Sequence, residues 1–313
     1  MFGTYRFALA LLVALSHFGW IWEGFNPGQW AVVGFYVLSG FLMERQFHKL
    51  APRSGVRGFY LDRFLRIYPL YLTVLILGLF LTPPTHPLTI ILNVFLLPQN
   101  YAYLTGSPSI IDTAWSLACE AHFYTLVPIL VLLPTWILRM LITGSLVIFT
   151  AASFLRDPTF WTYIFLPGML FTFLTGILIN RRDWKDVRNL YGTIAILGVV
   201  FMLTKMSPLG LKSGTQINVC VGYLLAVPTI SLLSKRSPQV SWDKFLGLFS
   251  YPLFLMHPLV KTYLKDYTHW QYTWSYMAIS IAATGALIIL VEKPFDRIRY
   301  MIRKSTPPAD SEA

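Results

Sequence analysis

Long apolar runs, each about 17–25 residues, alternate along the chain with short polar segments that carry most of the charge. A helix of that length crosses the hydrocarbon core of a bilayer, which is about 30 Å thick. The pattern therefore predicts ten membrane-spanning helices. They fall at residues 5–22, 28–44, 65–81, 113–133, 136–154, 160–180, 190–205, 215–233, 245–264 and 273–292.

Two segments do not fit the spanning pattern. The run 88–98, bounded by Pro87 and Pro98, is too short to cross a bilayer, and we interpret it as a re-entrant or interfacial piece. Residues 301–313 are polar and contain proline, which predicts a disordered cytoplasmic tail. We expect this tail to follow a single transmembrane domain of residues 1–300.

The composition agrees with this pattern. Of the 313 residues, 55% are hydrophobic and only 12% are charged, with a mean hydropathy of +0.57. These values exclude an ordinary soluble domain, a disordered chain and a nucleic-acid-binding domain. The expected fold class is all-α, a polytopic membrane protein in contact with lipid. Cys119 and Cys220 lie far apart in apolar runs, so they indicate neither a disulfide framework nor a metal site.

The basic residues predict the orientation of the helices. Cytoplasmic loops of membrane proteins carry an excess of Lys and Arg, which explains a net charge of +11 without nucleic acid. Placing both termini in the cytoplasm puts 20 of the 25 Lys and Arg residues on that side. The remaining five, expected outside, are Arg156, Lys205, Lys212, Lys261 and Lys265.

Ionisable side chains inside a predicted span are costly, so each is a candidate functional residue. Arg6 and His17 lie 11 residues apart in the first helix. At about 100° and 1.5 Å per residue they share a face and are about 16 Å apart along the axis. They are candidates for a site, although on spacing alone the better explanation is Arg6 as a cytoplasmic anchor and His17 bonded to a neighbouring helix.

Two further buried candidates lie in later helices. Glu120 falls about 9 Å below the predicted outer surface, where a carboxylate must pair or take up a proton. His257 stands beside Pro258, which frees the carbonyl four residues earlier in the helix. A structural hydrogen bond for Glu120 and a kink filled by His257 are the alternatives. His122 lies about 200° from Glu120 around the helix, and we expect a packing role for it.

Three other features suggest close approach or charge recognition. Ser39 and Gly40 lie mid-helix, where small residues admit a neighbouring helix or a ligand. Arg63 and Arg66 share one helix face at the cytoplasmic end, which suits a phosphate group of a ligand or of a lipid. Glu292, at the inner end of the last helix, is either a site residue or an interfacial charge.

Six short motifs occur in order along the chain. They are Arg6 to His17 with ten residues between, VLSGFL (37–42), R-x-x-R with RIYPLY (63–71), WSL-x-x-E-x-x-FY (115–124), SYPLFLMHP (250–258) and E-x-P (292–294). As a set they resemble the acyltransferase-3 family of integral membrane acyltransferases. The resemblance covers residues 6 to about 295. It implies ten spans, a short acyl group carried by cytoplasmic acyl-CoA, and a carbohydrate or glycolipid acceptor at or beyond the outer face.

This resemblance assigns roles to the candidates. His17 is the expected catalytic group, either removing the acceptor proton or carrying the acyl group. Arg63 and Arg66 would bind the CoA phosphates. Arg6 and Glu120 are the other expected catalytic residues: Arg6 would bind a CoA phosphate or hold the donor on the His17 face, and Glu120 would orient or deprotonate an imidazole or a sugar hydroxyl. The remaining substrate-contacting residues would be Ser39, Trp115, Tyr124 and His257. Acetyl-CoA is the default donor substrate, and no bound cofactor is expected.

The resemblance has one departure and two rival interpretations. Val33 stands where many relatives carry an acidic residue before the VLSGFL-like run. Buried ionisable groups and proline-broken helices also suit a secondary transporter or exporter. A non-catalytic scaffold is the third possibility. The expected location is a bacterial inner membrane, and the sequence leaves the acyl group, the acceptor and the oligomeric state open.

Overall fold

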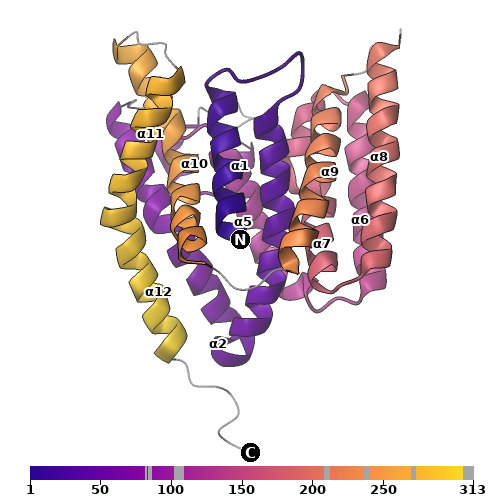
Figure 1. The fold of residues 1–313 in the computed structure, drawn as a ribbon, viewed down its shortest axis with the longest axis horizontal. Coiled ribbons are helices and arrows are strands. Elements are labelled where there is room, and N and C mark those ends of the chain that lie inside the picture. Colours follow the sequence, from indigo (N-terminus) through magenta and orange to yellow (C-terminus); the bar gives the residue numbers. More distant parts are fainter. Residues whose placement is uncertain are drawn as a thin grey trace, which may run out of the picture.

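A computed structural model describes residues 1–81, 83, 87–101, 109–207, 212–235, 240–268 and 273–305. In these residues the protein is a bundle of helices, and the only β-type pairing is an isolated bridge between Trp22 and Phe25. Figure 1 shows the helices running side by side along one direction, with the α1–α2 loop at one end of the bundle. The predicted all-α class is confirmed.

The first helix, α1, spans Phe2–His17 and ends five residues before the predicted boundary. The apolar pattern continues to Trp22, but Gly19 has φ +99° and begins a turn that ends the helix. His17 is therefore the last residue of a helix. It lies beside the loop at the end of the bundle rather than within a continuous span.

The second helix, α2, spans Pro27–Leu81 and contains two predicted spans. Gly55, with φ 65° and ψ −174°, breaks it into two arms that fold back on each other, as Figure 1 shows. The ring centroids of Phe47 and Phe59 lie 5.4 Å apart across the bend, and the side-chain amide of Gln46 donates to Asp62 at 3.0 Å. The arms correspond to the predicted spans 28–44 and 65–81.

Most of the other helices overlap the predicted runs, because long apolar segments leave little ambiguity, whereas a helix over the charged residues 293–305 is not predicted. Their bounds are α3 Pro87–Val94, α5 Ala114–Leu130, α6 Thr135–Ala151, α7 Leu166–Asn180, α8 Trp184–Met206, α9 Gly214–Ser234, α10 Ser241–Thr268, α11 Thr273–Leu287 and α12 Lys293–Ser305. Short 3₁₀ and π turns, Ala152–Phe154, Phe160–Ile164 and Ile288–Glu292, link some of them.

Six helices of the described residues are long and apolar enough to cross a membrane. One of them is the bent α2, and one is the continuous stretch Trp274–Met301. The protein is an integral membrane protein. The count of ten spans and the cytoplasmic location of both termini stay predictions.

The structure also describes the two segments that do not fit the spanning pattern, the run 88–98 and the first part of the expected tail. The run 88–98 contains only the eight-residue helix α3, about 12 Å long and too short to span. Asn93 fastens α3 by accepting the amide hydrogen of Ile110 at 2.9 Å. Helix α12 continues to Ser305 and so includes the first part of the expected tail, whereas residues 306–313 lie outside the described residues.

Small residues bring α2 and α7 into close contact. A Cβ added at Gly40 would lie 1.8 Å from the Phe173 carbonyl oxygen, and one at Gly176 would lie 2.1 Å from that of Val37. The helix backbones therefore touch at these two positions. The close approach expected at Ser39–Gly40 is confirmed, and it holds Ser39 in the centre of the bundle.

Candidate active site

Two histidines from distant parts of the chain meet at the end of the bundle that carries the α1–α2 loop. The ring centroids of His17, from α1, and His257, from α10, lie 5.0 Å apart with an interplanar angle of 83°. His257 is fully buried. The structure thus brings together two histidines that the sequence analysis names as separate candidates in the first and ninth predicted spans.

The hydrogen bond of His257 to its own helix fixes its tautomer. Nδ1 lies 2.9 Å from the carbonyl oxygen of Leu253, and a carbonyl only accepts, so Nδ1 carries the hydrogen. Nε2 then presents a lone pair, and this buried atom has no hydrogen-bond partner within the part of the chain that the structure describes. His257 therefore offers an unused proton acceptor beside His17.

Pro258 has the effect that the sequence predicts. It lacks an amide hydrogen, so the carbonyl of Phe254 has no partner within α10. The hydroxyl of Thr113, at the start of α5, donates to this carbonyl at 3.1 Å. This bond ties α5 to α10 one turn from His257, and the helix continues through the proline.

A lysine completes the end of α1. The last carbonyls of a helix lack intrahelical donors, and the ammonium of Lys261 donates to the carbonyl oxygen of His17. The bond places a cation beside both histidines. From the sequence, Lys261 is only a basic residue expected outside the membrane. Nothing near it in the sequence shows that its ammonium reaches the end of α1.

A cavity of about 160 Å³ lies next to His17. It has room for about five water molecules. Its wall comes from α1, the start of α2, the start of α5 and α10, with polar groups on most sides. The lining residues are Val13, Ser16, His17, Asn26, Gly28, Gln29, Val32, Thr113, Trp115, Ser116, Tyr163 and Phe254.

Trp115 closes this cavity on the α5 side, and its ring lies 4.9 Å from that of Tyr163. Val33 is fully buried instead, and its Cβ faces Gly222 on α9. The position that is acidic in many relatives therefore belongs to the α2–α9 contact here. His122 bonds the Ala118 carbonyl of its own helix at 2.8 Å, in keeping with the packing role expected for it.

The carboxylate of Glu120 belongs to a second polar cluster. Its Oε1 accepts hydrogen bonds from the hydroxyls of Ser39, at 2.6 Å, and Tyr124. Arg6 interacts electrostatically with Glu120 and Tyr124. Glu120 does not line the cavity beside His17, so the structure separates the expected single site into a histidine pair and a Glu120 cluster.

Arg6 itself has no ion pair within 4.0 Å among the residues that the structure describes. A partly buried guanidinium without a direct counterion is unusual inside a membrane protein, because such charges are normally paired. Arg6 lies about 16 Å below His17 on the same face of α1.

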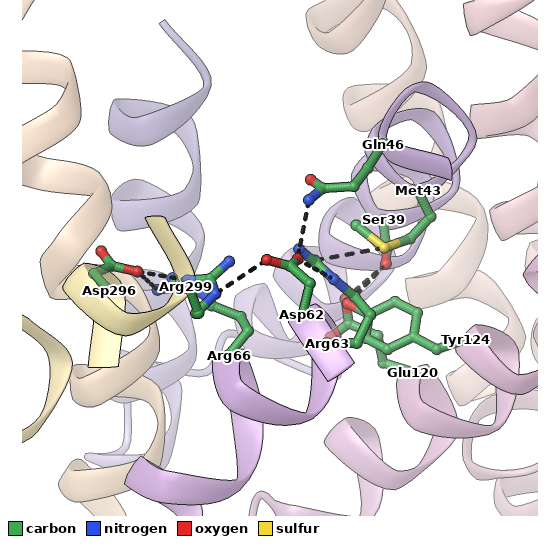
Figure 2. A network of polar contacts seen from close by, with 10 residues as sticks. All are labelled: Ser39, Met43, Gln46, Asp62, Arg63, Arg66, Glu120, Tyr124, Asp296 and Arg299. Atoms are coloured by element: carbon green, nitrogen blue, oxygen red, sulfur yellow. Dashed lines mark hydrogen bonds and ion pairs between the residues drawn. The ribbon is translucent and has the colours of Figure 1, made fainter. Parts of the chain in front are cut away.

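Arg63 and Arg66 lie in an ion-pair network that continues from the Glu120 cluster, as Figure 2 shows. Arg63 pairs with the adjacent Asp62, and Arg66 donates to Glu292 at 3.0 Å. Asp62 also bonds Arg299 of α12 at 3.4 Å. The two arginines share a helix face as predicted, yet each already has a carboxylate partner.

Several members of this network could not be named from the sequence. Asp62 and Arg299 are 237 residues apart, and only the packing of α12 against α2 joins them. Asp296 bonds Arg299 at 2.5 Å and lies 3.9 Å from Arg66. The sequence shows only that residues 293–304 are rich in Lys and Arg, which predicts a cytoplasmic segment after the last span.

Comparison with known proteins gives one family and two relatives. The acyltransferase-3 family model, described as an acyltransferase domain, matches residues 5–292. A peptidoglycan O-acetyltransferase of Listeria monocytogenes is 23% identical, covering 95% of this chain and 55% of that protein. An uncharacterized protein of Aquifex aeolicus is also 23% identical, covering 62% of this chain and 91% of that protein. No solved structure matches.

Proposed function

Because the chain belongs to the acyltransferase-3 family and is therefore an O-acyltransferase, we propose the substrates on which it acts. A short acyl group, acetyl by default, moves from cytoplasmic acyl-CoA to a hydroxyl of a carbohydrate or glycoconjugate at or beyond the outer face. The observation that carries this proposal is the His17–His257 pair beside a small polar cavity.

The reaction needs a base for the acceptor hydroxyl, and His17 is the proposed base. Its imidazole removes the hydroxyl proton while the oxygen attacks the thioester carbonyl. The C–S bond then breaks, and the CoA sulfur leaves and takes the proton. In the alternative route His17 attacks the thioester first and passes the acyl group to the hydroxyl in a second step.

His257 supports either route through its free Nε2 lone pair. A second imidazole 5.0 Å away can accept a hydrogen bond from a protonated His17 or from the acceptor hydroxyl. The cation Lys261, held on the His17 carbonyl, disfavours a lasting positive charge on this pair. The repulsion by Lys261 favours return of the proton to the leaving sulfur.

Arg6 and the Arg63–Arg66 network are proposed to hold the donor. Arg6 is the stronger candidate, because its guanidinium has no ion-pair partner within the described residues. Arg63 and Arg66 would bind phosphate in competition with Asp62 and Glu292. Glu120, with Ser39 and Tyr124, would then orient the acyl-bearing end between the two clusters.

The size of the cavity supports a short acyl group. A volume of about 160 Å³ accommodates an acetyl or propionyl group together with one alcohol carbon, but not a long chain as well. The acceptor hydroxyl would enter from the end of the bundle that holds the α1–α2 loop. On the predicted topology this is the outer end.

The test compares His17→Ala with His122→Ala in detergent-purified protein. Transfer of radiolabelled acetyl from acetyl-CoA to an alcohol acceptor is measured, with thermal unfolding as the check on folding. His17→Ala should lose at least about a hundredfold in kcat, because general base or nucleophilic catalysis is removed. His122→Ala should stay close to wild type. A folded His17→Ala protein that transfers acetyl at the wild-type rate would contradict the proposal.

A further inference from the structure

One exposed side of the first arm of α2 carries three basic side chains. Arg45, Lys49 and Arg53 follow one another at intervals of four residues, and all three are exposed. Residues four apart lie about one turn apart on the same side of a helix, so these three form a basic stripe that is about 12 Å long. The stripe ends just before the bend at Gly55.

The basic stripe has no counterion within the described residues. None of its three side chains lies within 4.0 Å of a carboxylate there. The sequence has no Asp or Glu at positions 45–61. The acidic residues that flank this segment, Glu44 and Asp62, are buried and already paired with Arg181 and Arg63. The charge of the stripe is therefore available to an anion from outside the chain.

The stripe lies at the level of the lipid head groups. Figure 1 shows the α2 bend at the end of the bundle opposite the α1–α2 loop. The predicted second span covers residues 28–44, so Arg45 is the first residue beyond the hydrocarbon core. The head-group layer on each side of that core is about 5–8 Å thick. A stripe about 12 Å long that begins at the core boundary passes through this whole layer.

The second arm of α2 has an apolar exposed side next to the same bend. Val56, Tyr60, Leu61 and Phe64 are all exposed, and three of them again follow one another at intervals of four residues. Exposed aromatic and aliphatic side chains beside basic ones are typical of a segment at the boundary between lipid and water. A soluble polyanion such as a nucleotide gives these apolar side chains nothing to contact, whereas a phospholipid does.

We propose that the basic stripe is a binding surface for anionic phospholipids. Arg45, Lys49 and Arg53 donate charge-assisted hydrogen bonds to the phosphate oxygens of the head groups. The exposed apolar side chains of the second arm contact the adjoining lipid chains. No residue of the stripe lines the cavity beside His17 or belongs to the Arg63–Arg66 network, so the inference does not rest on the proposed function.

The test measures lipid binding to the full chain, purified in dodecyl maltoside. Dioleoylphosphatidylglycerol, which is anionic, and dioleoylphosphatidylcholine, which is zwitterionic, are titrated separately. Native mass spectrometry counts the bound lipids, and thermal unfolding checks the fold. The stripe variant carries Arg45→Gln, Lys49→Gln and Arg53→Gln together.

A matched control loses the same charge at other positions. It carries Arg156→Gln, Lys205→Gln and Lys212→Gln, three exposed basic residues that the topology predicts on the opposite side of the membrane. Neither variant touches a buried group, so both should melt near the wild-type temperature when no phosphatidylglycerol is present.

In the wild type we expect phosphatidylglycerol to bind at least tenfold more tightly than phosphatidylcholine, because each basic residue near the head groups strengthens the attraction. It should also raise the melting temperature, as a ligand of the folded state does. The stripe variant should lose most of the preference and of the stabilisation, and the control should keep both. Added salt should weaken the preference in the wild type.

Three outcomes would overturn the inference. They are a wild type that binds both lipids equally, a preference that the stripe variant keeps, and an equal loss in the control, which would assign the effect to net charge. Calorimetry with acetyl-CoA distinguishes lipid from donor, since its dissociation constant should stay within about twofold in the stripe variant. A weaker affinity for acetyl-CoA with an unchanged lipid preference would assign the stripe to the nucleotide part of the donor instead.

Discussion

At the scale of single residues, the candidate site is distinguished by polar groups that the fold leaves without partners. The Nδ1–H group of His257 donates to the Leu253 carbonyl. Its Nε2 atom has no hydrogen-bond partner among the described residues, although the side chain is fully buried. Burial of an unsatisfied nitrogen costs about 1–3 kcal/mol. In the proposed mechanism this nitrogen accepts a proton or a hydrogen bond during transfer, which would offset the cost.

His257→Phe tests that use, because phenylalanine keeps the ring shape and removes both nitrogens. If Nε2 accepts a proton or a hydrogen bond during transfer, kcat should fall about 10²–10⁴-fold. The affinity for acetyl-CoA should stay near the wild-type value, since the donor network lies on other residues. Steady-state kinetics and calorimetry measure the two quantities. A kcat within threefold of wild type would limit His257 to packing.

The sequence indicated His17, His257, Glu120 and Arg6, because ionisable groups inside apolar runs are conspicuous. It could not indicate Lys261. A lysine near the end of an apolar run shows no partner in the sequence pattern, and only the packing of α10 against α1 brings its ammonium to the His17 carbonyl. Signals of that kind exist only after the fold has placed neighbours around the side chain.

At the scale of helices, the position of Ser39 depends on the backbone contact between α2 and α7. Ser39 donates to Glu120 at 2.6 Å and is buried. The contact exists because Gly40 and Gly176 have no side chains that would separate the two helices. Small residues here therefore serve the geometry of the Glu120 cluster as well as packing.

Gly176→Val tests this contact. Its new side chain would begin 2.1 Å from the Val37 carbonyl oxygen and 2.5 Å from the Phe41 amide, neither of which can move freely. Overpacking of this kind costs about 1–3 kcal/mol. The expected result is a lower melting temperature in detergent together with reduced transfer. Gly192→Ala on α8, where a Cβ meets nothing within 4 Å, is the matched control and should melt at or above the wild-type temperature.

The existence of the helices could be predicted because a run of apolar residues is sufficient to define each one. Their ends could not. The apolar character of the first run continues past His17, and the turn at Gly19 becomes visible only from its backbone angle of +99°. In the sequence, Gly55 is likewise only one residue of a polar segment between two predicted spans, and nothing there indicates a sharp bend. Both breaks matter, since one places His17 at a helix end and the other sets Arg63 opposite Met43.

At the scale of the whole molecule, α1 connects two polar clusters about 16 Å apart, with Arg6 in one and His17 in the other. One cluster continues into the ion pairs of α2 and α12 (Figure 2), and the other borders the cavity near the α1–α2 loop (Figure 1). This division suits a reaction whose two substrates arrive from opposite sides. The pairing of Asp62 with Arg299 that builds the first cluster depends on tertiary packing, which one sequence alone does not contain.

The ion-pair network gives the last prediction, because its arginines are balanced by carboxylates. Arg66→Ala alone would leave the buried carboxylate of Glu292 without its ion-pair partner, a change that commonly costs about 3–5 kcal/mol and confuses binding with folding. The pair Arg66→Met with Glu292→Met removes the cation and its partner together. It should melt near the wild-type temperature. If Arg66 holds a CoA phosphate, its dissociation constant for acetyl-CoA should rise about tenfold, equivalent to about 1.4 kcal/mol.

The comparison with acetyl-pantetheine, which lacks the phosphates of the nucleotide part, separates the phosphate contact from the rest of the donor. Wild type should bind acetyl-CoA more tightly than acetyl-pantetheine, and the double variant should lose most of that difference, while Arg57→Ala at the exposed α2 bend keeps it. The preference should also weaken as salt is raised, because phosphate recognition at a partly open site is screened. An undiminished preference in the folded double variant would assign the Arg66–Glu292 pair to the stability of the α2–α12 contact and leave Arg6 as the candidate phosphate ligand.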